Sequence, residues 1–444
     1  MELKDKRVLV VGFGRTGRDS ARFLAQQGAH VLVSDLHPEA ALRAEMTELS
    51  DPAIEYRLGA EEPDCLDGID YVIPSPGVAR ENLLLQEASA RRIPILSEIE
   101  LAYRFIRAPV IAITGTNGKS TTTTLVGEML TTAGKKVFVG GNLGVPFISA
   151  VSNDWDWTVL EISSFQLEWV KQFRPRVAVL LNLSEDHLDR YASFAEYCAA
   201  KARIFAAQRS SDIAILNRDD APVWEMCNRL NSRVLSFGFA EVGEGVFVAG
   251  DEIIWRDSGA EERFSLANVK LHGIHNLENM MAAVAATKAI GVAHDSIEMV
   301  LNRFPGLEHR LEFVRDKDGV AYYNDSKGTN VGAVVKSLES FSAPVILLAG
   351  GVDKGGCYAP MERQVEKKVR RLVLFGAAKE IIARALGGLT DTVIVEDLPA
   401  AVADAAAHSR PGDVVLLSPA CSSFDQFKNY AERGRAFKTL VQNL

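Results

Sequence analysis

The stretch that decides the fold is Val110-Ile-Ala-Ile-Thr-Gly-Thr-Asn-Gly-Lys-Ser-Thr121. It opens with an apolar run that predicts a buried strand, passes through a turn with two glycines, and ends where a helix begins. In such a segment the backbone N–H groups of the turn and of the helix N-terminus converge on one point. Gly115 and Gly118 let an anion approach, and Lys119 adds a positive charge. The segment therefore predicts a phosphate-binding loop in a parallel α/β sheet.

The match to the P-loop formula is incomplete, because Ile113 stands where the formula has its first glycine. A chance Gly-Lys-Ser is the alternative, but the strand before it and the helix after it favour a functional loop. A hydroxyl from this loop could join a Mg²⁺ shell, since that ion prefers oxygen ligands beside phosphate oxygens. We expect ATP phosphates along Gly115, Thr116, Asn117, Gly118, Lys119, Ser120 and Thr121.

On both sides of this loop, short apolar runs alternate with helix-length segments, a pattern typical of parallel sheets wrapped by helices. A chain of 444 residues is long for one core, and three such blocks can be separated. We predict three α/β domains: a Rossmann-like one at 1–97, a central P-loop ATPase-like parallel sheet at 98–309, and a Rossmann-like one at 310–444. The expected strands are 7–11, 31–34 and 71–73, then 110–113, 158–161, 177–181 and 213–216 with a hairpin at 243–256, then 320–323, 345–349, 372–375, 393–395 and 414–417.

Composition narrows the class of protein. A net charge of −9 disfavours nucleic-acid binding, and every apolar run is far shorter than the ~20 residues of a membrane-spanning helix. The five cysteines are scattered without a CxxC pair, which argues against a disulfide framework or a structural zinc site. No export signal is visible at the N-terminus. We expect a cytoplasmic protein that binds neither nucleic acid nor membrane.

Downstream of the loop, polar residues follow two strands. Glu161 ends the run 158–161, where a carboxylate can hold Mg²⁺ beside a phosphate loop, although a strand-ending glutamate is otherwise often a solvated cap. His187 lies in a polar loop and could ligate metal, bind a substrate phosphate, or simply form a cap. Lys201, on an expected helix 194–207, reads as a solvated surface lysine, and Asn276 reads as the N-cap of a helix 276–290.

Near the N-terminus, the run 8–17 contains a full GxGxxG after a strand, and Asp35 ends the next strand. This fingerprint predicts a tight turn and a helix N-terminus aimed at a diphosphate or ribose. It does not identify the nucleotide, so NAD and UDP both remain open. A NAD-dependent oxidoreductase with an added ATP site, and a non-catalytic nucleotide sensor, are the alternatives to an ATP-consuming enzyme.

The motifs along the chain form a longer joint pattern. They are TGTNGKST (114–121), GGNLG (140–144), LEISSFQL (160–167), NLSEDHLDR (182–190), GIHNLENMMAA (273–283), LEHR (307–310), NDSKGTN (324–330) and SPACSSFDQFKNYAERG (418–434). In this order they resemble the Mur ligase family over essentially the whole chain, most closely its D-glutamate-adding branch. The resemblance implies a cytoplasmic step of peptidoglycan synthesis. ATP would phosphorylate the alanine carboxylate of UDP-N-acetylmuramoyl-L-alanine, and the amine of D-glutamate would then displace phosphate; another amino acid such as L-glutamate is the alternative.

The resemblance also implies roles for the central residues. Lys119 would contact the transferred phosphate, Ser120 or Thr121 with Glu161 would hold one Mg²⁺, and His187 would hold a second. ATP would further contact Asn276, Arg310 and Asp325.

Lys201 falls where the family has a carbamoylated lysine that supports the second ion. Such a modification needs a neutral amine, which burial would favour. The protein is expected to act as a monomer on small molecules. The UDP-substrate would lie against Gly14, Arg15, Thr16, Asp35, Ser75, Gly77, Asn142 and His187, and the amino acid against Lys327, Thr329, Lys354, Ser423 and Tyr430.

Overall fold

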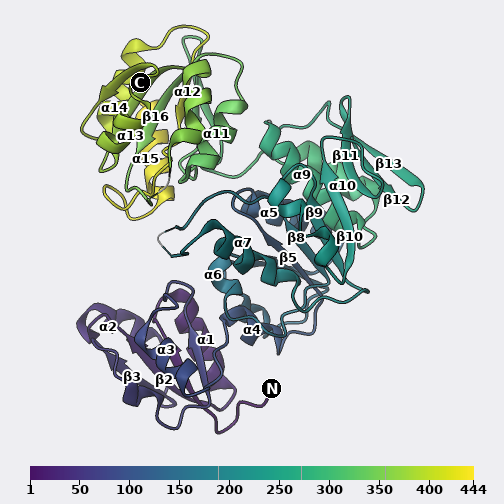
Figure 1. The fold of residues 1–444 in the computed structure, drawn as a ribbon, viewed down its shortest axis with the longest axis vertical. Helices are drawn as coiled ribbons and strands as arrows, with labels where there is room; N and C mark the ends of the chain where they lie inside the picture. Colours follow the sequence, from purple (N-terminus) through teal and green to yellow (C-terminus); the bar gives the residue numbers. More distant parts are fainter. Residues whose placement is uncertain (189, 272, 356) are drawn as a thin grey trace.

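One sheet forms in each of three consecutive stretches of the chain, and helices cover each sheet (Figure 1). The computed structural model describes residues 1–188, 190–271, 273–355 and 357–444. The three units follow one another along the long axis, with the central one between the other two (Figure 1). The predicted class, three α/β domains with mostly parallel sheets, is confirmed.

The first sheet is wholly parallel, in the order β3-β2-β1-β4. Strand β3 (Ile54–Leu58) was not expected, because charged residues interrupt its apolar pattern, as an edge strand allows. Its presence extends the sheet beyond the three strands that were predicted. The remaining elements are β1 (Arg7–Val11), α1 (Arg15–Gln26), β2 (His30–Asp35), α2 (Glu39–Glu48), β4 (Tyr71–Pro74) and α3 (Leu83–Ala90).

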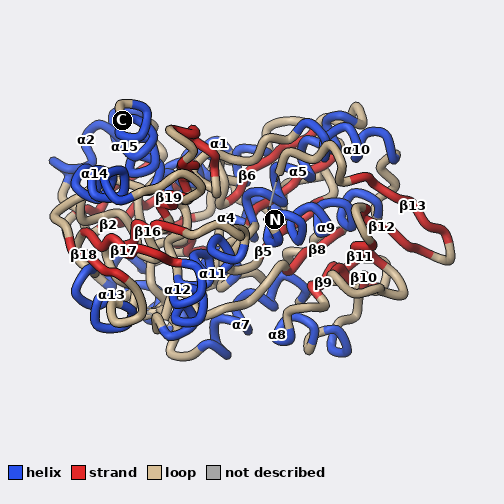
Figure 2. Tube along the Cα trace, turned by 90° about the horizontal axis from the view of Figure 1, so that it is seen from above, coloured by secondary structure: helices blue, strands red, loops and turns tan. Residues whose placement is uncertain are grey.

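The central sheet has nine strands in the order β13-β12-β11-β10-β9-β8-β5-β7-β6. The β11–β12 and β12–β13 pairings are antiparallel, and β12 and β13 project away from the rest of the molecule (Figures 1 and 2). The expected hairpin is therefore one strand larger. The strands are β5 (Val110–Thr114), β6 (Val137–Gly141), β7 (Trp157–Glu161), β8 (Val177–Leu180), β9 (Ile213–Asn217), β10 (Arg233–Gly238), β11 (Gly245–Ala249), β12 (Glu252–Asp257) and β13 (Ala260–Ser265).

The third sheet has six strands in the order β14-β15-β19-β16-β17-β18, and only the β14–β15 pairing is antiparallel. All five predicted strands form. Strand β14 was missed, because its alternation is weak. The elements are β14 (Glu312–Lys317), β15 (Val320–Asn324), α11 (Val331–Glu339), β16 (Val345–Gly350), α12 (Glu362–Lys368), β17 (Val369–Phe375), α13 (Lys379–Leu386), β18 (Asp391–Ile394), α14 (Leu398–His408), β19 (Val414–Leu417) and α15 (Tyr430–Gln442).

Helix α4, Glu98–Tyr103, follows the first domain. Two helix expectations need correction. The helix expected over 194–207 ends at Ala202 and continues as a short 3-10 turn. Asn276 is not an N-cap, because Gly273 takes that position and Asn276 lies inside the helix. The central helices are α5 (Lys119–Thr132), α6 (Ser164–Leu167), α7 (Phe194–Ala202), α8 (Ala221–Trp224), α9 (Ile274–Lys288) and α10 (His294–Arg303).

No helix in the described ranges is both long and apolar enough to cross a bilayer.

Helix α4 carries a buried acid where it packs on the 3-10 turn Phe147–Ala150. The Glu98 side chain is 1% exposed, and its Oε1 accepts a hydrogen bond from the Ile148 N–H at 2.5 Å. Its Oε2 has no hydrogen-bond partner among the described residues. Burial raises the pKa of Glu98 to about 7, and the neighbouring charge of Asp19 adds to that shift.

Between pH 4.5 and 7 the folded protein therefore holds a proton on Glu98 that the unfolded chain releases. Stability from this group falls as pH rises through 7. We expect the free energy of unfolding of Glu98→Gln, relative to that of the wild type, to increase by on the order of 2 to 3 kcal/mol as the pH rises from 5 to 8. Urea unfolding at several pH values measures this difference. The exposed Glu39→Gln is the matched control. An equal pH dependence in Glu98→Gln and wild type would contradict the prediction.

Candidate functional site

The loop between β5 and α5 has a shape that only glycine permits at two positions. Gly115 has a φ of 154° and Gly118 a φ of 82°, and both are conformations that other residues rarely adopt. A Cβ at Gly118 would lie 2.1 Å from Asn279 Oδ1. Lys119 Nζ donates to the backbone oxygens of Gly115 at 2.8 Å and Thr116 at 2.7 Å. The half-buried Lys119 side chain therefore lies over the loop, where a bound phosphate would meet its ammonium group.

A carboxylate and a hydroxyl meet beside this loop. Ser120 Oγ donates to Glu161 Oε2 at 2.5 Å, and Asn142 Nδ2 donates to Glu161 Oε1 at 2.5 Å. Burial would raise the pKa of Glu161, but the charge of Lys119 and the bond from Ser120 hold it below its usual value. Arg310 Nη2, from the third domain, donates to Ser120 Oγ at 2.6 Å. An ionised carboxylate next to a hydroxyl is an oxygen donor set that suits Mg²⁺.

The ion would need more oxygens than the protein supplies. In the part of the chain that the structure describes, no group of three or more His, Cys, Asp or Glu side chains could hold a metal. Thr121, only 3% exposed, adds a second hydroxyl to the loop. Phosphate oxygens and water would therefore have to complete the shell, as is usual for Mg²⁺ beside a nucleotide.

Lys201 is not the surface residue that its sequence context suggested. It is 2% exposed, and its Nζ donates to the Gly115 backbone oxygen at 2.8 Å. The ammonium group also lies 4.8 Å from the centre of the Tyr197 ring. Burial, together with the charge of Lys119, lowers the pKa of Lys201 well below its usual value. A neutral amine at this place has the chemistry that reaction with CO₂ requires.

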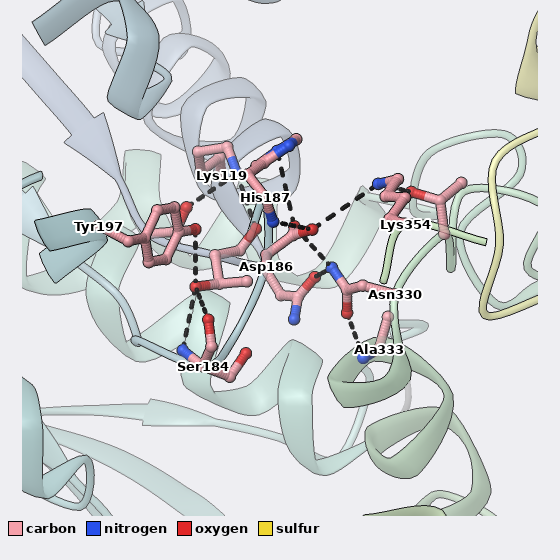
Figure 3. A network of polar contacts seen from close by, with 12 residues as sticks. Lys119, Ser184, Asp186, His187, Tyr197, Asn330, Ala333 and Lys354 are labelled. Carbon is pink, nitrogen blue, oxygen red and sulfur yellow. Dashed lines mark hydrogen bonds and ion pairs between the residues drawn. The ribbon is translucent and has the colours of Figure 1, made fainter. Parts of the chain in front are cut away.

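His187 belongs to the polar network drawn in Figure 3, next to Asp186. Its backbone has a φ of 56°, and its ring packs edge-on against Phe165 with centroids 4.8 Å apart. Its Nε2 is 3.7 Å from Asp186 Oδ2. The side chain thus points into the site, as a ligand for metal or phosphate would.

Three polar contacts join the central domain to the third domain at this point (Figure 3). Asn330 Nδ2 donates to Asp186 Oδ2 at 3.1 Å and to Asn117 Oδ1 at 3.3 Å. Lys354 Nζ lies 3.7 Å from Asp186 Oδ1. Asp186 and Asn330 lie within the motifs 182–190 and 324–330, but neither residue was predicted to belong to the site. Only the folded structure shows that these two residues, from different domains, are in contact.

A cavity of about 290 Å³ lies between the central and third domains. Burial raises the pKa of Asp325 to about 6, and this carboxyl accepts hydrogen bonds from the hydroxyls of Ser337 and Ser418 at 2.7 Å each. Asn182 and Asn279 also line the cavity and were not predicted. The predicted ATP residues that line it are Asn117, Gly118, Thr121, Asn276, Arg310 and Asp325.

A larger cavity, of about 940 Å³, receives residues from all three domains. Lys327 Nζ lies 3.8 Å from the centre of the Tyr430 ring. Burial, and then the charge of Arg310, lowers the pKa of Lys327 to about 7. Gly77 and His187 border the same space. The five predicted amino-acid residues all line it: Lys327, Thr329, Lys354, Ser423 and Tyr430.

The N-terminal glycine turn forms as predicted. Gly14 caps α1, and a Cβ at Gly17 would lie 2.0 Å from the Gly12 oxygen. Asp35 is not free, because its Oδ2 accepts from the Phe13 N–H at 2.7 Å and so holds the turn.

Arg15 and Thr16 open helix α1, and Arg15 Nη1 donates to the Gly144 oxygen of the central domain at 2.7 Å. Ser75 Oγ donates to the Gly12 oxygen at 2.7 Å. Asn142 lies apart from this group, on Glu161. Asp189 of the motif 182–190 and Gly356 after Lys354 lie outside the described residues.

Comparison with known proteins matches all three domains of the chain to one family. Family models match residues 6–97 (Mur ligase MurD-like, N-terminal domain), 113–287 (Mur ligase middle domain) and 309–421 (Mur ligase, glutamate ligase domain). The UDP-N-acetylmuramoylalanine--D-glutamate ligase of Geotalea uraniireducens is 51% identical, with 100% of this chain and 99% of that protein covered. The chain belongs to the Mur ligase family. It is thus an ATP-dependent amide-forming ligase.

Other Mur ligases agree with this placement. The protein of the same name in Geobacter metallireducens is 49% identical, with 100% of this chain and 99% of that protein covered. Two solved structures share the fold at low identity. They are UDP-N-acetylmuramate-alanine ligase MurC from Thermotoga maritima (TM-score 0.59, 19% identity, 99% of each chain covered) and MurF ligase from Thermotoga maritima in complex with ADP (TM-score 0.60, 17% identity, 100% of this chain and 97% of that chain covered).

Proposed function

We propose that this Mur ligase joins D-glutamate to UDP-N-acetylmuramoyl-L-alanine through an acyl phosphate, with ATP as the phosphoryl donor. The observation that carries the proposal is the cavity of about 940 Å³ in which cationic and hydroxyl side chains of the third domain face His187 and Gly77. This arrangement suits an amine-bearing dicarboxylate meeting a substrate delivered by the first domain. Relatives at about half identity over the full chain bear the name of that reaction.

Activation is needed because a carboxylate resists attack by an amine. In the first step a carboxylate oxygen of the UDP-sugar substrate attacks the terminal phosphorus of ATP, and the bond from that phosphorus to ADP breaks. Lys119 and Arg310 lie where they can neutralise charge on the moving phosphoryl group. The protein mainly positions the two reactants in line.

In the second step the amine nitrogen, already deprotonated, attacks the acyl carbon. The bond from that carbon to the phosphate oxygen breaks, phosphate leaves with the electron pair, and the nitrogen loses its second proton as the amide forms. Lys327 and Lys354 are placed to hold the carboxylates of the amino acid, with Thr329 and Ser423 as hydroxyl donors. A set of this kind would accept glutamate of either hand, so we assign the D-form from the names of the relatives.

Two groups of residues in this site could hold Mg²⁺. Ser120 or Thr121 with Glu161 would hold one ion, and His187 with a carbamoylated Lys201 would support a second. Bound Mg²⁺ would supply charge neutralisation on the phosphate oxygens. Burial of Lys201 lowers the pKa of its amine, and this favours the carbamate.

The glycine turn of the first domain would hold the uridine diphosphate part of the substrate rather than NAD. Asp35 keeps that turn closed, and Gly14, Arg15, Thr16 and Ser75 gather around it. Asn142 would reach the diphosphate from the central domain. We place the enzyme in the cytoplasmic stage of peptidoglycan synthesis, acting as a monomer.

A phosphate-release assay tests substrate, stereochemistry and reaction class together. We expect release only when ATP, Mg²⁺, UDP-N-acetylmuramoyl-L-alanine and D-glutamate are all present, with L-glutamate and other amino acids inactive. Preference for another amino acid would move the enzyme to a different member of the family. Hydride transfer to a nicotinamide cofactor, or nucleotide binding without any turnover, would refute the proposal.

A further inference from the structure

A third concave surface lies at the opposite end of the central sheet from the phosphate loop. It is a cavity of about 660 Å³ beside residues 104–109, the segment that leads from α4 into β5. Val110, the first residue of β5, borders it, whereas the phosphate loop follows the last residue of the same strand. The cavity is therefore separated from the ligase site by the whole length of β5.

Arginines dominate the lining of this cavity. Two come from the connecting segment and two from the residues that precede β8. Asp212, just before β9, is the carboxylate on the wall, and Glu100 lies beneath it on α4. Cations thus outnumber carboxylates on a chain whose net charge is −9. The arginines are Arg104, Arg107, Arg174 and Arg176.

The charge of Glu100 is already engaged by the protein. Its side chain is fully buried, and Oε2 accepts from the backbone N–H groups of Lys171, Gln172 and Phe173 at 2.9 Å each. Oε1 accepts from Arg104 Nε at 2.9 Å and Nη2 at 2.8 Å. This carboxylate has little capacity left to neutralise another cation.

Asp212 is engaged in the same way. Arg174 binds it through two nitrogens, with Nε to Oδ2 at 2.6 Å and Nη2 to Oδ1 at 3.2 Å. The backbone N–H of Arg209 donates to Oδ2 at 2.8 Å. Arg176 Nη1 is 3.6 Å from the same carboxylate and donates instead to the Ser211 backbone oxygen.

Guanidinium donors consequently remain without an oxygen acceptor. In the described ranges of the chain, Arg107 has no hydrogen-bond or ion-pair partner, and it is exposed. Arg104 Nη1 has only the Met1 sulfur, at 3.8 Å, among the atoms that the structure describes. Arg176 is 45% exposed. These donors come from two segments that face the same cavity.

We propose that this cavity is a binding site for a phosphate-bearing anion, distinct from the ATP and UDP-sugar sites. The planar guanidinium group presents paired N–H donors that match phosphate oxygens. A concave wall carrying net positive charge concentrates the field on such an anion. Its volume lies within the range of small-molecule sites and exceeds the needs of a single inorganic phosphate.

A bound anion would contact two parts of the chain that already pack together through Glu100. It would add a link between the segment 104–109, which leads from α4 into β5, and the residues that precede β8. Its chemistry is that of a phosphoryl oxyanion, whether free or esterified.

Calorimetric titration with pyrophosphate tests this site. The protein is first saturated with Mg²⁺-ADP and UDP-N-acetylmuramoyl-L-alanine, so that the phosphate loop and the proposed UDP-substrate site are both filled. We expect one further pyrophosphate to bind the wild type, and Arg107→Glu to weaken it at least about tenfold, the equivalent of one lost charge-assisted contact. A second arm with glycerol phosphate separates a free phosphate ligand, which gains nothing from the esterifying group, from an esterified one, which does.

Arg363→Glu, which reverses an exposed arginine on α12, is the matched control and should bind pyrophosphate as the wild type does. Arg107 makes no internal contact in the described structure, so its variant should fold and release phosphate normally. The proposal is overturned if the wild type, saturated with ADP and the UDP-substrate, binds no pyrophosphate, or if Arg107→Glu binds it as tightly as Arg363→Glu does. Neither result would alter the proposed ligase activity.

Discussion

Lys119→Ala is expected to reduce phosphate release by at least about a thousandfold. The Lys119 ammonium group lies over the phosphate loop, near the negative charges of Glu161 and Asp186. Removing it takes away one of the two cations, Lys119 and Arg310, that can neutralise charge on the transferred phosphate. Binding of the UDP-substrate should stay nearly unchanged, since its proposed site lies on the first domain. Phosphate release and equilibrium binding of the UDP-substrate are the two measurements.

The exposed Lys135→Ala, near the end of the same helix, is the matched control and should keep full activity. If Lys119→Ala weakened both activity and UDP-substrate binding to the same degree, the two sites could not be as separate as we describe. A folded Lys119→Ala enzyme that kept wild-type turnover would remove the phosphate loop from the mechanism.

Lys201→Ala is expected to lower turnover by roughly a hundredfold, and small carboxylates such as formate or acetate should restore part of it. The reason is that the buried Lys201 amine, held against Gly115, is depressed in pKa and so available to form a carbamate. An added carboxylate can occupy the space and supply the negative charge that the carbamate would provide. The measurement is the turnover of Lys201→Ala as a function of the concentration of added carboxylate.

Two comparisons make this test specific. Lys171→Ala removes an exposed lysine of the same domain and should neither lose activity nor respond to carboxylates. Mass spectrometry of the intact wild type under CO₂ should show one carbamate that Lys201→Ala lacks. A variant that no carboxylate rescues, together with an unmodified lysine in the wild type, would exclude the carbamate.

Much of the site could be predicted because its residues lie within short motifs. The order strand, glycine turn and helix at 110–121 carries its own geometry, since positive φ at Gly115 and Gly118 is a local property. The same holds for the glycine turn of the first domain. Strands buried on both faces, such as β8 and β16, were found from apolar runs alone.

Edge elements and capping positions were less predictable. Strands β3, β13 and β14 lie at sheet edges and mix charged with apolar residues, so their alternation is weak. Asn276 has the right residue type for an N-cap, but Gly273 occupies that position because the chain enters the helix there with positive φ. Local preference could not choose between the two.

The sequence by itself determined the three α/β units, the phosphate loop and the identity of the side chains that can hold phosphate and carboxylate. Only the tertiary structure decided that Lys201 is buried against Gly115. It also decided that Asp186 contacts Asn330 and Lys354 of another domain, and that four arginines line one cavity at the start of β5. The physical reason is that burial and the distances between charges depend on residues far apart in the chain. Those quantities, and not residue type, set the pKa of a lysine or the partner of a carboxylate.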